Sequence, residues 1–270
     1  MIIGNILINK IIYKKEVIYK NDFFFYHDTM KKIIYILIAL FILVIVFFYR
    51  VKIEDIYTNS ISIPVPTSIS YEEAVQNMGD VQEEIPAEYN LAVPFMVQAP
   101  NANWDMPYQE ACEEAVMIML HYYLQNNELN NDKADEEILK LVEWQNEHYG
   151  DYKDTTILET ANIMKEYWGY DVQTIDNPSI DMIKEQIAMG RPVLASFYGR
   201  GLNNPYYSGE GPLYHMMVIK GYIDNKFITN DPGTKHGQDY MYDYDTIMLN
   251  MHDWNDGDVQ YGQARIFVVR

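Results

Sequence analysis

The sequence predicts an α+β fold, because helical patterns fill the first half of its long C-terminal part and strand patterns fill the second half. Apolar residues recur at three- and four-residue spacing in four stretches, which predict helices at 111–125, 134–148, 155–168 and 179–190. Short apolar or alternating runs between Gly, Asn and Asp predict antiparallel strands at 192–198, 214–222, 226–230 and 265–270.

Composition indicates a folded, acidic protein. The 270 residues are 49% hydrophobic, and 20 Lys and Arg stand against 39 Asp and Glu, for a net charge of −19. The basic residues gather at the front, so residues 53–270 hold only 12 basic residues against 36 acidic ones. Such a surface repels phosphate backbones, which excludes nucleic acid as a partner.

An apolar segment near the N-terminus predicts a membrane anchor. Residues 33–49 carry no charge and lie between Lys31-Lys32 and Arg50-Val51-Lys52. At about 1.5 Å per residue they reach roughly 25 Å, which snorkelling bases can extend to a bilayer core of about 30 Å. The run passes directly into charged residues without a small-residue cleavage site, so an uncleaved signal anchor is expected.

The anchor divides the chain into four parts. Residues 1–32 form a cytoplasmic N-terminus, in which 1–29 are a candidate mis-assigned extension because Met30 resembles the start of a bacterial signal sequence. Residues 33–49 form the transmembrane helix, 50–90 a stalk, and 91–270 one folded domain. The excess of bases before the anchor predicts a single-pass protein of the bacterial cell membrane, with its large domain extracytoplasmic.

Cys112 is the single cysteine, so it cannot form an intramolecular disulfide. It lies where a loop turns into the helix predicted at 111–125, and a helix N-terminus stabilises a thiolate through free N–H groups and the macrodipole. The position suits a nucleophile, although a lone cysteine is also compatible with a small buried apolar residue.

A nucleophilic thiol needs a neighbouring base, and His215 is the best placed histidine. It begins an apolar strand directly after a glycine-rich loop, 199–212, that we expect to border a substrate groove. The next strand ends in Asn230-Asp231, where either side chain could orient the imidazole if the two strands form a hairpin through Asp224-Asn225.

Four segments together resemble the peptidase C-39-like family, a group of papain-fold proteins related to the double-glycine bacteriocin-leader peptidases. They are VPFMVQAP at 93–100, PYQEACEEA at 107–115, YHMMVIKGY at 214–222 and NDPG at 230–233. The resemblance extends from about Leu91 to the C-terminus and implies a papain-like cysteine peptidase fold. It implies four catalytic roles: Cys112 as nucleophile, His215 as base and acid, Asp231 (or Asn230) as the group that orients His215, and Gln98 as an oxyanion donor.

Other residues near the thiol have expected roles. Gln109 is a rival oxyanion donor, although a structural contact at the helix start suits it better. Glu113 and Glu114 should point away from the Cys112 direction and favour the helix N-terminus more than they harm the thiolate. No cofactor or metal site is expected, and the acidic run 253–258 has the wrong spacing for a calcium loop and predicts a solvated turn.

Two functions fit this sequence. The first is a membrane-anchored cysteine hydrolase that cleaves a peptide or amide bond through a Cys-His-Asp triad and a thioester acyl-enzyme. The second is a catalytically silent papain-like domain that binds peptide or cell-wall material. Both predict a peptide or amide ligand and a membrane contact through one N-terminal helix, and neither requires an obligate protein partner. Substrate, oligomeric state and the true start codon are not encoded in any motif.

Overall fold

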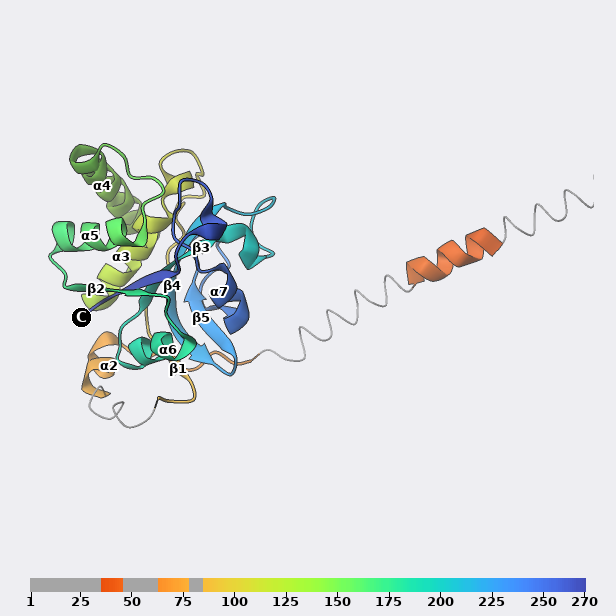
Figure 1. Cartoon of the computed structure of the whole chain (residues 1–270), viewed down its shortest axis with the longest axis horizontal. Helices are drawn as coiled ribbons and strands as arrows, with labels where there is room; N and C mark the ends of the chain where they lie inside the picture. Colours follow the sequence, from red (N-terminus) through yellow and green to blue (C-terminus); the bar gives the residue numbers. More distant parts are fainter. Residues whose placement is uncertain (1–34, 46–62, 78–84) are drawn as a thin grey trace, which may run out of the picture. The chain divides into compact units, whose positions relative to one another are not determined.

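The computed structural model describes residues 35–45, 63–77 and 85–270. The chain divides into two compact units, Met1–Pro64 and Val65–Arg270. In the first unit, residues 35–45 are helical and their side chains are exposed. The second unit holds every other element and the residues of the candidate site (Figure 1).

The predicted transmembrane helix is not found in the described part of the chain, where no helix is long and apolar enough to cross a membrane. The helix at 35–45 covers the middle of the predicted span, and the flanking residues 33–34 and 46–49 lie outside the described residues.

One antiparallel sheet forms the frame of the second unit. Its strands follow the order β2-β7-β3-β4-β5-β6, and β1 pairs with β4 outside this path. The strands are β1 Tyr89–Asn90, β2 Val172–Asp176, β3 Val193–Tyr198, β4 Tyr214–Ile223, β5 Lys226–Asn230, β6 Tyr240–Asp243 and β7 Arg265–Val269. All pairings between these strands are antiparallel, which confirms the predicted mixture of helices and antiparallel sheet.

Six α-helices and three 3₁₀ turns accompany the sheet in this unit. The helices are α2 Tyr71–Asn77, α3 Cys112–Leu124, α4 Asn131–Tyr149, α5 Ile157–Trp168, α6 Ile180–Ala188 and α7 Tyr244–Asn250. The 3₁₀ turns are η1 Tyr108–Glu110, η2 Gly199–Leu202 and η3 Val259–Tyr261. Figure 1 shows α3, α4 and α5 gathered together, apart from α6 and α7.

Local sequence signals determine where the middle helices begin and end. The Asn130 side chain caps α4, and the Thr156 and Glu159 side chains form a reciprocal capping box at the start of α5. Both helices end at a glycine with positive φ, Gly150 and Gly169, because a left-handed residue satisfies the last carbonyl groups without a Cβ clash.

Helix α3 is the central helix of the core. Its residues from Cys112 to Leu120 are all buried, and it packs against β4 at the centre of the sheet. A helix that is apolar nearly all round belongs in the interior of a domain rather than on its surface. This packing brings the start of α3 to the strand that carries His215.

The folded unit begins earlier than the predicted boundary at 91. Helix α2 and strand β1 lie within the segment predicted to be a stalk, with Ala74 and Tyr89 buried in the core. Strands β2 and β6 and helix α7 were also not predicted. Each is short and mixes polar with apolar residues, so neither a helical nor a strand period is visible in the sequence.

Candidate active site

His215 and Asp231 form a buried pair on neighbouring strands. His215 is the second residue of β4, Asp231 directly follows β5, and the two strands form the predicted hairpin through Asp224 and Asn225. The distance from His215 Nε2 to Asp231 Oδ1 is 2.7 Å, with the side chains 2% and 0% exposed. The sheet therefore brings together an imidazole and a carboxylate that lie sixteen residues apart.

Asp231 is held by four further donors. Its Oδ1 accepts the Gly233 backbone N–H, and its Oδ2 accepts hydrogen bonds from Asn204 Nδ2 (3.0 Å), Tyr207 Oη (2.7 Å) and Tyr242 Oη (2.8 Å). Burial raises the pKa of Asp231, but the His215 charge and these donors outweigh burial and lower it. The carboxylate is thus ionised and fixed in position.

These supporting residues were not found from the sequence. Asn204 and Tyr207 come from the loop after η2, and Tyr242 comes from β6, so no local spacing connects them with Asp231. Burial and the Asp231 charge raise the pKa of both tyrosines, which keeps their hydroxyl groups protonated as donors. The glycine-rich loop predicted to border a groove therefore supplies the buried shell of the carboxylate.

The Asp231 contact determines which imidazole nitrogen is free. Since Nε2 faces a carboxylate, it is assigned the proton and donates it, which leaves Nδ1 as the basic nitrogen of the neutral ring. Gly233 allows this close packing, because a Cβ there would lie 3.0 Å from His215 Cε1 and 3.2 Å from Asp231 Oδ1. The geometry suits an imidazole that accepts a proton through Nδ1.

Cys112 is the first residue of α3, one residue after the predicted start of this helix, and the residue is only 6% exposed. The hydrogen bond of Sγ goes to Glu113 Oε2 at 3.0 Å, and among the described residues no hydrogen bond joins the thiol to His215. Burial, followed by the Glu113 charge and hydrogen bond, raises the pKa of Cys112 well above its usual value. A hydrogen bond from the backbone of Met216, the residue after His215 on β4, lowers the pKa of Cys112.

The prediction that the Glu113 and Glu114 side chains point away from Cys112 and do little to disfavour its thiolate was wrong. Both side chains are buried, because α3 has no solvent-facing side at its start. Burial raises the pKa of Glu113 well above its usual value and that of Glu114 to about 7. Glu114 Oε1 accepts a hydrogen bond from Gln145, while its Oε2 has no hydrogen-bond partner.

Gln98 links the two sides of the site. Its Nε2 donates to the carbonyl oxygens of Tyr108 (3.0 Å) and Gln109 (3.1 Å), just before Cys112. Its backbone N–H donates to Pro232 O, just after Asp231. Both amide protons of Gln98 are directed at backbone carbonyls in this arrangement, and the side chain of the rival donor Gln109 is exposed.

Asn230 points away from His215. Its Nδ2 donates to the carbonyl oxygens of Val93 and Pro94, and its Oδ1 accepts the Asp239 N–H. It therefore ties the segment before Gln98 to the sheet, and in this structure Asp231 is the residue that contacts the imidazole.

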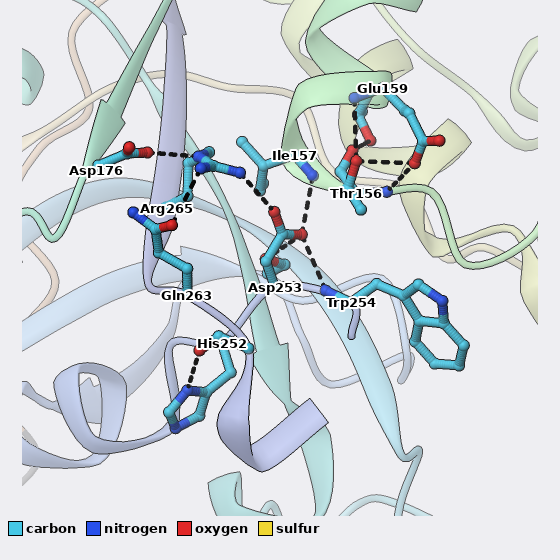
Figure 2. A network of polar contacts seen from close by, with 12 residues as sticks. Thr156, Ile157, Glu159, Asp176, His252, Asp253, Trp254, Gln263 and Arg265 are labelled. Carbon is cyan, nitrogen blue, oxygen red and sulfur yellow. Dashed lines mark hydrogen bonds and ion pairs between the residues drawn. The ribbon is translucent and has the colours of Figure 1, made fainter. Parts of the chain in front are cut away.

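Asp253 lies at the centre of a second polar network (Figure 2). Its Oδ1 accepts the backbone N–H of Ile157 and of Trp254 and the hydroxyl of Tyr214, and its Oδ2 accepts from Arg265. The prediction of a solvated turn is wrong for Asp253, which is 3% exposed. It is buried because its carboxylate accepts the backbone N–H of Ile157 at the start of α5. The network anchors the residue that precedes His215.

Two further findings describe the surroundings of the site. A cavity of about 1020 Å³ is lined by residues of the α4–α5 connection and by Trp254, and neither Cys112 nor His215 is among its lining residues. Among the residues that the structure describes, no group of three His, Cys, Asp or Glu side chains is placed to hold a metal ion.

Comparison with known proteins assigns the family. The model of the Peptidase_C39 like family matches residues 90–261. A solved structure of a candidate C39-like peptidase from Bacillus anthracis is similar at 16% identity, covers 66% of this chain and 95% of its own, and has a TM-score of 0.44. No curated protein matches. Since the family model spans well over half of the sequence, the chain belongs to the Peptidase_C39 like family.

Proposed function

We propose that the protein is an active cysteine peptidase-like hydrolase that cleaves a peptide or amide bond. The observation that carries the proposal is the His215–Asp231 pair, which is buried and hydrogen-bonded at 2.7 Å. The Asp231 carboxylate of this pair also accepts hydrogen bonds from Asn204, Tyr207 and Tyr242. Burying an ionised carboxylate is costly, and strongly perturbed titratable groups gather at functional sites, so this buried pair supports a catalytic role. Membership of the Peptidase_C39 like family also supports a cysteine peptidase-like activity, without specifying the residues that carry it out.

The proposed reaction uses three residues in sequence. His215 Nδ1 accepts the Cys112 proton, and the thiolate attacks the carbonyl carbon of the substrate to form a tetrahedral oxyanion. Imidazolium then protonates the leaving amine, the C–N bond breaks, and a thioester to Cys112 remains. Water, deprotonated by His215, hydrolyses the thioester, while Asp231 holds the ring and stabilises its charge. The Cys112 backbone N–H is the proposed oxyanion donor, and one good donor contributes about 10² to 10³ in rate. Gln98 joins it only when one of its amide protons leaves the carbonyl oxygens of Tyr108 and Gln109, to which both are directed in this structure.

A second candidate is a catalytically silent peptide-binding domain. The observation that favours it is the thiol itself, which is buried and hydrogen-bonded to Glu113, with a raised pKa. A buried thiol with a raised pKa reacts slowly, and a domain that only binds peptide does not need a base to activate it.

Thiol reactivity separates these two functions. The full chain is treated with iodoacetamide between pH 5 and 9, and turnover is followed with peptide and peptidoglycan libraries. A hydrolase loses turnover with Cys112→Ala and loses at least tenfold in alkylation rate near neutral pH with His215→Ala. The matched control is His148→Ala, an exposed histidine on α4. Equal alkylation rates for the wild type and His215→Ala would refute the catalytic proposal.

We also propose that residues 33–49 anchor the protein in the bacterial membrane, with the large domain extracytoplasmic. Their uninterrupted apolar character and flanking bases support this. The test is fractionation of cells that express the full chain or a variant lacking 33–49, with protease added to spheroplasts. Recovery of the full chain in the washed soluble fraction would refute the anchor.

A further inference from the structure

The side chain next to the nucleophile makes a contact that the proposed mechanism does not use. Cys112 Sγ lies 3.0 Å from Glu113 Oε2, and both residues are buried, at 6% and 2% exposed. This is a hydrogen bond between adjacent residues at the first turn of α3. The thiol therefore has a partner before any substrate arrives, and that partner is a carboxyl group rather than the imidazole.

Ionisable groups that influence Glu113 electrostatically come from three neighbouring segments. Glu114 is its neighbour on α3, Tyr214 faces it from β4, and Tyr152 and Asp154 face it from the connection before α5. Tyr214 is itself engaged with Thr155 O and Asp253. None of these groups is a cation that could pair with the carboxyl. Among the described residues, the side-chain partner of Glu113 is the Cys112 thiol, and its own backbone N–H contributes a second hydrogen bond.

We propose that Glu113 is a positioning residue that holds the Cys112 thiol in a resting arrangement, from which the thiol must be released before His215 takes its proton. The inference rests on the proposed function. No covalent bond changes during release: the S–H group leaves Glu113 Oε2 by rotation of the Cys112 side chain. Its proton then passes to His215 Nδ1, which gives a thiolate and an imidazolium.

The chemistry of the contact predicts its effect on reactivity. An S–H group that donates to a carboxylate is stabilised in its protonated form, and the carboxylate charge opposes formation of a thiolate beside it. Burial raises the pKa of Glu113, so this effect acts at pH values above that raised pKa, where Glu113 is ionised. Both effects act in the direction found for the pKa of Cys112. Removing the charge while keeping the side-chain shape should therefore make the thiolate easier to form.

The test is the pH dependence of Cys112 alkylation by iodoacetamide in the full chain. Glu113→Gln removes the charge and adds an amide donor to the thiolate, so its pH–rate profile is expected to shift to lower pH by about one unit. On the rising limb of the profile this is a roughly tenfold faster reaction. The matched control is Glu110→Gln, which removes an equal charge two residues before the thiol without touching it, and its profile should match the wild type.

The outcomes separate this inference from the proposed function. An unshifted profile for folded Glu113→Gln, with a slower reaction in His215→Ala, would overturn the role of Glu113 alone. A shift in Glu113→Gln with no effect of His215→Ala would overturn both. If Glu113→Gln does not fold, Glu113→Leu removes the same charge with an apolar side chain that suits a buried position, and the same shift is required of it.

Discussion

Asp231→Asn tests how strongly the polar shell supports the candidate site. The carboxylate accepts two hydrogen bonds at Oδ1, from His215 and the Gly233 N–H, and three at Oδ2, from Asn204, Tyr207 and Tyr242. An amide of the same shape must direct its NH₂ group at one of these two sets of donors. The tyrosine hydroxyls can rotate to accept a hydrogen bond from the new amide. Each hydrogen bond that the carboxylate accepted is nevertheless weaker, because the amide carries no charge.

The expected loss is about 3 kcal/mol or more in the free energy of unfolding. Hydrogen bonds to a charged group contribute about 1.5 to 3 kcal/mol each, and the substitution weakens several of them at once. The assay is urea denaturation of the full chain at pH 7, followed by tryptophan fluorescence. The matched control is Asp224→Asn, the same chemical change at an exposed turn residue of the same hairpin, whose φ of 50° suits Asn.

At acidic pH, the difference in the free energy of unfolding between the wild type and Asp231→Asn should become smaller. The pKa of Asp231 is lowered in the folded protein from an ordinary value of 3.8, so its contribution is present above that pH. The contribution is lost as the pH falls through the lowered value, because the folded state then also binds the proton. A loss below about 1 kcal/mol at pH 7, or a difference unchanged in acid, would refute this account of the site.

Three further changes test other parts of the site. Glu114→Gln should stabilise the protein by about 3 kcal/mol at pH 8, since burial raises the pKa of this carboxyl from 4.5 to about 7; the gain should vanish in urea titrations below pH 4.5. Tyr242→Phe removes one hydrogen bond to Asp231 and should cost about 1.5 to 3 kcal/mol, whereas Tyr222→Phe removes a buried hydroxyl without a partner and should cost nothing. Gly233→Ala should lower turnover at least tenfold with little change in the unfolding midpoint, because its Cβ would press on the imidazole; unchanged turnover would contradict that contact.

Much of the candidate site could be placed from local patterns. The helix that begins at Cys112 follows from its apolar spacing, and the β4–β5 hairpin follows from two apolar runs joined by Asp224 and Asn225. Because neighbouring antiparallel strands lie about 5 Å apart, a histidine early in β4 and an aspartate just after β5 could be expected to meet. The family resemblance already favoured Asp231 over Asn230, and the structure supplied the distance and showed that Asp231 is the one that contacts the imidazole.

Other features had no local signal. Strand β2 is stabilised by β7, far along the chain, and β6 by the preceding strand β5, rather than by a strong period of their own. The tyrosines that hold Asp231 come from a loop and an edge strand, and their side chains converge only after the sheet forms. Asp253 resembles a turn residue in sequence, yet its position at the start of α5 buries it.

The sequence by itself determined the family, the order of the main helices and strands, and the residue types available for thiol chemistry, since these depend on periodicity, turn residues and short motifs. Only the tertiary structure decided which groups touch. It placed Glu113 rather than His215 against the Cys112 thiol, and it surrounded Asp231 with donors from β4, from the loop after η2 and from β6. The physical reason is that hydrogen bonding, burial and pKa depend on distances between side chains, which packing sets and residue spacing along the chain does not.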